Sequence, residues 1–172
     1  PGPGVGGHCI PLDPYYLAWK AREFDYHTKL IETSGIINDS MPDYIVERAS
    51  RILNRFKKPL NGSKILILGV AYKQDIDDIR HSPALRVIEG FEKRGSIVNY
   101  YDPYVPEYNY RGKTKSSIKE LNKEELQAAD LIVITTAHTS IDYDFIQANS
   151  KFIFDTKNAM KGVKQRNNIE LL

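Results

Sequence analysis

The chain has 172 residues, 41% of them hydrophobic, and a formal net charge of +2 at pH 7. This length suits one domain with an additional helical element, and the near balance of charge argues against nucleic acid or an anionic membrane as a partner. The single cysteine excludes an internal disulfide, disfavours a metal–thiolate site and fits a cytoplasmic location. No apolar run approaches the roughly 20 residues that a membrane helix needs.

The start of the chain is a loop by composition, because residues 1–14 contain four glycines and four prolines. A chain seldom begins inside such a loop, so we expect a further domain upstream of it. Residues 15–24 predict one helix, and apolar positions that recur three or four apart in residues 28–56 predict a longer helical region. Pro42 should either kink this region or open a new helix that Ser40 caps.

After a short basic linker at residues 57–63, strands alternate with helices. The expected strands are residues 65–70, 97–101, 131–136 and 152–154. The expected helices are residues 83–94, 118–128 and 143–147. Residues 105–116 are expected to be polar loop. This alternation predicts an α/β fold, with a Rossmann-like parallel sheet of at least four strands and right-handed crossovers.

The first group of residues with chemical potential is the loop at residues 2–14, which reads Gly-Pro-Gly-Val-Gly-Gly-His-Cys-Ile-Pro-Leu-Asp-Pro. Glycines allow a backbone to approach a ligand closely. A thiolate at Cys9 could attack a carbonyl carbon, and Asp13 could position a water molecule or accept a proton. The residues alone leave open a flexible loop with a bystander thiol.

The second group is the charged loop at residues 69–83, which follows the first expected strand. Ligands of open α/β sheets bind at the carboxyl ends of the strands. A helix that begins at Ser82 would offer free N–H groups to an anion, and Lys73 and Arg80 would add charges suited to phosphates. The loop has no Gly-x-Gly-x-x-Gly fingerprint. An alternative is a solvated loop in which both cations pair with its own aspartates, Asp75, Asp77 and Asp78.

A third motif, Tyr-Tyr-Asp-Pro at residues 100–103, closes the second expected strand. An acidic residue there can bind a ribose hydroxyl or cap a turn through the backbone, and we favour the turn for Asp102. Neighbouring residues on an extended loop usually point apart, so His8 is not expected to activate the thiol of Cys9. The other histidines share no spacing that suggests a metal site.

The loop at residues 2–14 resembles the active-site signature of the UDP-glucose/GDP-mannose dehydrogenase family, Gly-x-Gly-x-Gly-Gly-x-Cys-x-x-x-Asp. Its continuation, Asp-Pro-Tyr-Tyr-Leu, is most similar to the branch that oxidises UDP-N-acetylhexosamines. The later motifs follow in the family order, so the resemblance covers the whole chain. It implies oxidation of the C6 alcohol of a UDP-sugar to a carboxylate with two NAD, through a thiohemiacetal and a thioester on Cys9. Asp13 would assist hydrolysis of the thioester.

The resemblance also implies which residues bind. The implied substrate-binding residues are Gly4, Gly6, Gly7, Tyr15, Lys73 and Lys157, with Arg80 assigned to the cofactor and no metal ligand. The family has Asp-x-Arg-Asn after the last strand, whereas this chain has lysine in place of the arginine. Lysine keeps the charge but loses the bidentate fork, which puts tight contact at this point in doubt.

The implied organisation is an active-site cysteine loop at residues 1–14, a central helical dimerisation region at 15–58 and a UDP-sugar-binding domain at 64–172. The NAD-binding domain of the family precedes this chain, so the chain alone should not turn over. A homodimer is expected through the helical region, whose apolar side chains outnumber those that one neighbour can cover. These are Ile36, Ile37, Ile45, Ile52 and Leu53.

Two alternatives remain open from the sequence. Pro42 could split the helical region into two helices that fold back on the domain and bury the same side chains in a monomer. The chain could also be a non-catalytic nucleotide-sugar-binding or dimerisation module, or part of a UDP-glucose or GDP-mannose dehydrogenase of the same family.

Overall fold

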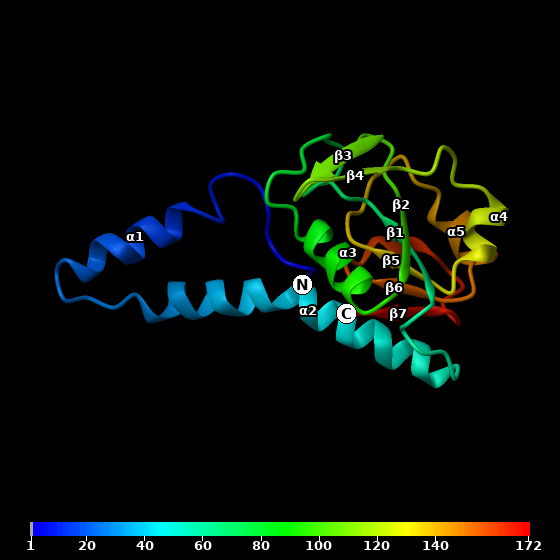
Figure 1. Ribbon diagram of the computed structural model, residues 1–172, viewed down its shortest axis with the longest axis horizontal. Coiled ribbons are helices and arrows are strands. Elements are labelled where there is room, and N and C mark those ends of the chain that lie inside the picture. Colours follow the sequence, from blue (N-terminus) through cyan, green and yellow to red (C-terminus); the bar gives the residue numbers. More distant parts are fainter. Residues whose placement is uncertain (1) are drawn as a thin grey trace.

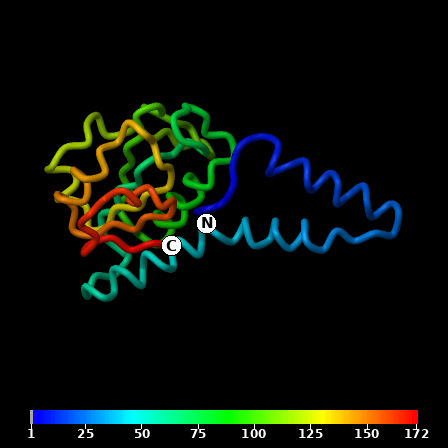
Figure 2. Tube along the Cα trace, turned by 180° about the vertical axis from the view of Figure 1, so that it is seen from behind, coloured from blue at the N-terminus to red at the C-terminus, as the bar shows by residue number. Residues whose placement is uncertain are grey.

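Two helices form an arm that leads into the sheet, α1 (Asp13–Arg22) and α2 (Lys29–Arg55). In the computed structural model, which describes residues 2–172, α1 and the first half of α2 project away from the rest of the chain (Figures 1 and 2). The second half of α2 packs against α3 (Pro83–Lys93). Both expected helices are therefore present, within two residues of the expected bounds.

Pro42 lies inside a continuous α2, so of the two expected outcomes, a kink or a new helix, the new helix is excluded. Ser40 is not a helix cap either, because its hydroxyl donates to the carbonyl oxygen of Ile37 at 2.7 Å. The ribbon changes direction in the middle of α2, where Pro42 lies (Figure 1). A proline bends a helix because it lacks an N–H and its ring crowds the preceding turn.

The sheet is parallel, with five strands in the order β2-β1-β5-β6-β7. The strands are β1 (Lys64–Leu68), β2 (Ile97–Tyr101), β5 (Leu131–Ile134), β6 (Ile153–Asp155) and β7 (Ile169–Leu171). The first four confirm the expected strands. The sequence analysis missed β7, whose three residues are too short to show a periodicity. Glu170 in β7 accepts a hydrogen bond from Arg48 of α2 at 2.7 Å, which ties this edge strand to the helix.

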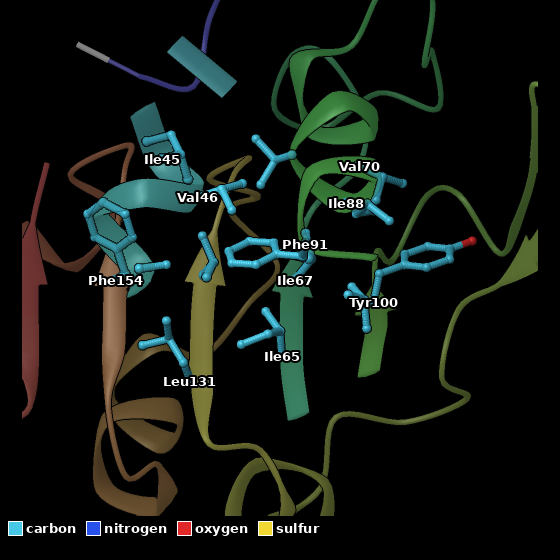
Figure 3. Close-up of a cluster of buried hydrophobic side chains, with 14 of the residues drawn as sticks. Ile45, Val46, Ile65, Ile67, Val70, Ile88, Phe91, Tyr100, Leu131 and Phe154 are labelled. Atoms are coloured by element: carbon cyan, nitrogen blue, oxygen red, sulfur yellow. The ribbon is translucent and has the colours of Figure 1, made fainter. Parts of the chain in front are cut away.

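Helices cover both faces of the sheet, so the domain has three layers (Figure 1). The helices α2 and α3 cover one face, and the short elements α4 (Lys123–Ala128), α5 (Tyr143–Asn149) and η1 (Ala159–Gly162) cover the other. Successive strand residues point to opposite faces, so Ile65 and Ile67 of β1 lie in the core beneath α2 and α3. Figure 3 shows this core, which also holds the buried ring of Phe91.

Two expectations for the middle of the chain were wrong. Residues 105–116 are not loop, because β3 (Glu107–Tyr110) and β4 (Lys113–Ser116) form an antiparallel hairpin. Its turn, Arg111-Gly112, has positive φ at both residues, a geometry more often marked by asparagine or aspartate before the glycine. The helix expected from residue 118 begins only at Lys123, after the side chain of Asn122 accepts a hydrogen bond from the backbone of Glu125 at 3.0 Å.

Candidate functional site

The glycine-rich loop at residues 2–12 links the carboxyl edge of the sheet to the helical arm. Near its start, Gly2 lies against Lys157, which follows β6. The N–H of Val5 donates to the side-chain oxygen of Asn38 on α2 at 2.8 Å. The N–H of Gly7 donates to the carbonyl of Arg80 at 2.9 Å. The structure therefore brings together two of the sequence motifs, the cysteine loop and the charged loop that follows β1.

Glycine is required at two of these positions by close packing on the protein. A Cβ at Gly6 would lie 2.7 Å from the Cβ of Tyr72 and 2.8 Å from the carbonyl oxygen of His81. Gly7 has a φ of +95°, and a Cβ there would lie 2.9 Å from the ring of Tyr72. The contacts that explain Gly6 and Gly7 are thus with the charged loop, and their expected contact with substrate remains a prediction, as does that of Gly4.

Cys9 and Asp13 lie one helical turn apart at the entry to α1. The carbonyl of Cys9 accepts hydrogen bonds from the N–H groups of Leu12 at 3.0 Å and Asp13 at 2.8 Å. Both Cys9 and Asp13 are exposed, and the thiol of Cys9 is free. This geometry gives both groups access to a ligand that approaches from solvent.

Arg80 forms an ion pair within its own loop. Its guanidinium donates to both carboxylate oxygens of Asp78, with the shortest contact at 2.7 Å. This hydrogen bonding raises the pKa of Arg80, with smaller electrostatic contributions from Tyr72 and Cys9, and it lowers the pKa of Asp78. The alternative that the loop pairs its own charges is confirmed for Arg80. Its side chain is still 63% exposed.

Lys73 and the other two aspartates of the loop are arranged differently. Lys73 and Asp77 are exposed. Asp75 does not pair with a cation of the loop, since its carboxylate accepts hydrogen bonds from the backbone N–H and the hydroxyl of Thr139, at 2.8 and 3.0 Å. Lys73 therefore presents its ammonium group to solvent at the carboxyl edge of the sheet, where a ligand phosphate could reach it.

Asp102 is buried and caps a turn, as expected. One of its carboxylate oxygens accepts hydrogen bonds from the N–H groups of Tyr104 at 2.9 Å and Val105 at 3.1 Å. The other accepts from Val70 and Ala71, at 2.7 and 3.1 Å, and so also fixes the chain just after β1. Burial alone would raise the pKa of Asp102, but hydrogen bonds from His138 and these N–H groups outweigh it and hold the pKa below its usual value.

His138 is the residue of this edge that the sequence analysis missed. It follows β5, is fully buried, and its Nε2 lies 3.0 Å from the buried oxygen of Asp102. Its Nδ1 accepts a hydrogen bond from the N–H of Asp75 at 3.0 Å. Its distance along the chain from the other histidines fits no metal site, so histidine spacing did not single it out. The available signal was its position after a buried strand, at the edge that also holds Lys73.

Ser82 caps α3 by position, but its side chain makes no cap hydrogen bond. Its hydroxyl is buried and has no hydrogen-bond partner among residues 2–172. The first turn of α3 contains no acidic residue, and the N–H of Leu85 in this turn donates to the carbonyl of Ser82 at 3.3 Å. Ser82 lines a cavity of about 940 Å³ between the arm, α3 and the hairpin, together with Arg80 and Arg86.

Lys157 and Tyr15 lie near opposite ends of the loop, Lys157 against Gly2 and Tyr15 in the first turn of α1. The buried carboxylate of Asp155 accepts the N–H of Lys157 at 2.9 Å, and this fixes the backbone at the end of β6. Tyr15 lines the cavity and packs over Gly35 of α2, where a Cβ would lie 2.2 Å from the phenol oxygen. Partial burial, followed by the nearby Asp39, raises the pKa of Tyr15. Substrate contact by Lys157 and Tyr15 remains a prediction.

Within residues 2–172, no cluster of three or more His, Cys, Asp or Glu side chains could hold a metal ion. None of the helices formed by these residues combines the length and apolar character needed to cross a membrane.

Comparison with known families matches two parts of the chain. Residues 66–162, more than half of the chain, match the UDP binding domain of the UDP-glucose/GDP-mannose dehydrogenase family. Residues 1–40 match the central domain of the same family. The matches therefore include both the cysteine loop and the charged loop of the candidate site.

Individual relatives agree with these matches. The chain is 37% identical to the UDP-N-acetyl-D-mannosamine dehydrogenase of Methanocaldococcus jannaschii, over 93% of this chain and 36% of the relative. It is 32% identical to the NDP-N-acetyl-D-galactosaminuronic acid dehydrogenase of Ralstonia nicotianae, over 91% of this chain and 36% of the relative. The chain thus spans little more than a third of the length of these relatives.

A solved structure, that of the UDP-D-ManNAc dehydrogenase from Pyrococcus horikoshii, superposes with a TM-score of 0.82 at 32% identity. The superposition covers 99% of this chain and 39% of that structure. The arm, the loop and the sheet therefore share one arrangement with this dehydrogenase.

Proposed function

The chain belongs to the UDP-glucose/GDP-mannose dehydrogenase family, and from this premise we propose that it is part of a UDP-sugar 6-dehydrogenase. In this proposal it supplies the catalytic cysteine and the nucleotide-sugar-binding domain, and an NAD-binding domain upstream completes the enzyme. The observation that supports it best is the packing of the cysteine loop on the charged loop after β1, through the hydrogen bond from Gly7 to Arg80.

Cys9 is the proposed nucleophile. Its thiolate attacks the C6 aldehyde carbon, the S–C bond forms, and the carbonyl electron pair moves to oxygen to give a thiohemiacetal. After oxidation of this adduct to a thioester, water attacks the same carbon, the C–S bond breaks, and the thiolate leaves with a carboxylate as product. Asp13, one turn away and exposed, is positioned to accept the proton of that water. Covalent attachment retains the aldehyde between the two oxidations.

Nucleotide binding is proposed at the carboxyl edge of the sheet. The exposed ammonium groups of Lys73 and Lys157 flank this edge after β1 and β6, and both can pair with diphosphate oxygens. The unpartnered hydroxyl of Ser82, at the start of α3, can donate to an anion as well. The lysine at 157 binds as a point charge and does not form a bidentate contact.

Each of the two oxidations would need its own NAD, which would supply the acceptor for one hydride. The residues of this chain fit such a cofactor at one point, Arg80. Its guanidinium is paired with Asp78 on one side and is 63% exposed. Its remaining N–H groups can therefore donate to a pyrophosphate oxygen of the cofactor.

The substrate is proposed to be a UDP-N-acetylhexosamine. This rests on the activities of the relatives, which include a UDP-N-acetyl-D-mannosamine dehydrogenase at 37% identity over 93% of this chain. A panel of UDP-N-acetylmannosamine, UDP-N-acetylgalactosamine, UDP-glucose and GDP-mannose, assayed with the full-length enzyme, separates this proposal from the other activities of the family.

A homodimer is proposed through the outer half of the arm. Leu30, Ile36 and Ile37 of α2 are 86%, 71% and 57% exposed, and such apolar patches are typical of interfaces. The expectation that Ile45, Ile52 and Leu53 share this interface was wrong, because all three are buried against the domain. The bend at Pro42 separates the two sets, so the inner half of α2 serves the core and the outer half is free for a partner.

The experiment that tests this function compares Cys9→Ala with His8→Ala in the full-length enzyme. We expect Cys9→Ala to reduce acid formation at least about a thousandfold while UDP binding is retained, since only the nucleophile is lost. His8 is the adjacent exposed residue and serves as the matched control, with activity near that of the parent. Undiminished turnover of Cys9→Ala would favour a non-catalytic module and refute the role of the thiol.

A further inference from the structure

The imidazole of His138 is in one defined neutral tautomer. Its Nδ1 accepts the N–H of Asp75 at 3.0 Å, and a ring nitrogen that accepts carries no hydrogen. The hydrogen therefore lies on Nε2, which donates to Asp102 across 3.0 Å. A single rigid ring thus joins the segments that follow β1, β2 and β5.

Asp75 also contacts Thr139, the residue that follows His138. Its carboxylate accepts hydrogen bonds from the N–H and the hydroxyl of Thr139 at 2.8 and 3.0 Å. Asp75 also has a φ of +62°, a left-handed conformation that is unfavourable for a residue with a side chain. The hydrogen bond that Asp75 donates to His138, and those that it accepts from Thr139, hold Asp75 in this conformation. We name this set, Asp75, His138 and Thr139, the loop clamp.

The loop clamp acts on the middle of the charged loop, between Lys73 and Arg80. On the far side of this loop, the carbonyl of Arg80 receives the N–H of Gly7 at 2.9 Å, and the ring of Tyr72 packs on Gly6 and Gly7. Release of Asp75 would therefore displace the two cations proposed to meet phosphates. His138 itself is fully buried and cannot touch a substrate.

We propose that His138 is a positioning residue, which holds the charged loop in the conformation that binds the nucleotide diphosphate. This inference rests on the proposed function of the loop. The hydrogen bond from Asp75 to Nδ1 does the positioning, and the bond from Nε2 to Asp102 satisfies a buried carboxylate. The two sides of the ring therefore have separate tasks, which conservative variants can separate.

The test compares His138→Asn with His138→Gln in this chain, with UDP as the probe in calorimetry. The Asn oxygen lies where Nδ1 was and keeps the acceptor for Asp75, whereas the Gln amide reaches towards Asp102 and leaves Asp75 without an acceptor. Both variants lose one buried hydrogen bond, so similar unfolding temperatures are expected. We expect UDP affinity to fall about tenfold in His138→Gln and to stay within about threefold of the parent in His138→Asn. Equal affinity of His138→Gln and the parent, or equal loss in both variants, would overturn the positioning role.

Hydrogen exchange at the amide of Asp75 distinguishes failure of the positioning role of His138 from failure of the proposed nucleotide site. The Asp75 amide should exchange slowly in the parent and in His138→Asn, and quickly in His138→Gln. Absence of UDP binding by the parent, with this exchange pattern intact, would overturn the nucleotide site and with it the positioning role, although the clamp would stand as a structural contact.

Thr139→Val keeps the test possible if the His138 variants do not fold. It removes only an exposed hydroxyl contact to Asp75, and UDP affinity should fall about threefold. The matched control is Thr114→Val on the hairpin, whose hydroxyl accepts from Asn109 at 3.2 Å. Parental affinity in Thr139→Val would count against the loop clamp.

Discussion

The arm and the sheet domain differ in how far their apolar side chains are buried. In the domain, the inner faces of α2 and α3 and both faces of the central strands bury their side chains, and Ile45 and Phe91 are fully covered. On the arm, Trp19 is 65% exposed and Leu30 86% exposed. The domain therefore has a complete core of its own, whereas the arm has the composition of a surface that a partner covers. One helix, α2, takes part in both regions.

The largest effect should come from a charge placed in the inner half of α2. Ile45→Glu puts a carboxylate into a fully buried position without a partner, which should cost about 4 kcal/mol or more and leave little folded protein. Urea denaturation followed by circular dichroism measures this cost. A variant as stable as the parent would show that the inner half of α2 does not belong to the core.

The matched substitution on the outer half, Ile37→Glu, should act on assembly and spare the fold. Ile37 is 57% exposed, so the free energy of unfolding should change by less than about 0.5 kcal/mol. Light scattering should give about twice the chain mass of 19.7 kDa for the parent and the chain mass itself for the variant. A parent already at the chain mass would contradict the dimer on the arm.

The junction between the two regions can be broken at Gly7. Its φ of +95° and the ring of Tyr72 at 2.9 Å leave no room for a methyl group, so Gly7→Ala should displace the cysteine loop. We expect a stability loss of about 1–2 kcal/mol and a larger loss of activity in the full-length enzyme. Gly162→Ala, which has nothing within 4 Å of its added Cβ, is the control. Equal kcat/KM values for the two variants would contradict the junction.

A smaller effect is expected on how the stability of the domain depends on pH, through Asp102. The pKa of Asp102 is lower in the folded chain than in the unfolded chain, so its contribution to stability is full above the unfolded value of about 3.9 and fades as pH falls through the folded value. Replacement by Asn should flatten the loss of stability with acid in this range. The measurement is the free energy of unfolding from pH 5 to 2.5, and an unchanged acid slope would argue against the hydrogen bonds assigned to Asp102.

The sequence predicted those parts of the molecule that local patterns specify. Apolar strand runs such as residues 65–68 and the Ser-Pro start of α3 were sufficient for the α/β fold, and the Gly–Cys–Asp spacing was sufficient for the family. The hairpin was missed because Arg111 is an unusual residue for its turn, and β7 because three residues carry no period. The division of α2 into a buried inner half and an exposed outer half could not be predicted from the spacing of apolar residues. Ile37 and Ile45 both fit the helical pattern, but only Ile45 is buried by the domain.

The role of His138 was also beyond the sequence. Its two partners, Asp75 and Asp102, are 63 and 36 residues away along the chain and meet it only at the carboxyl edge of the folded sheet. Strand order, which no local pattern contains, brings the three together. Residues proposed to act through other residues are therefore found from topology, whereas the proposed nucleophile, Cys9, lies in a motif that the sequence shows directly.

The most direct test of the central claim, that Cys9 is the nucleophile of a UDP-sugar dehydrogenase, is mass spectrometry of the full-length Asp13→Asn enzyme during turnover. Loss of the carboxylate should slow hydrolysis of the thioester, so an acyl adduct of the substrate should accumulate on the peptide that contains Cys9. The same peptide of a Cys9→Ala, Asp13→Asn double variant should carry none. Acid formation that continues at the parental rate, with Cys9 free of any adduct in the quenched enzyme and activity retained by the double variant, would contradict this role.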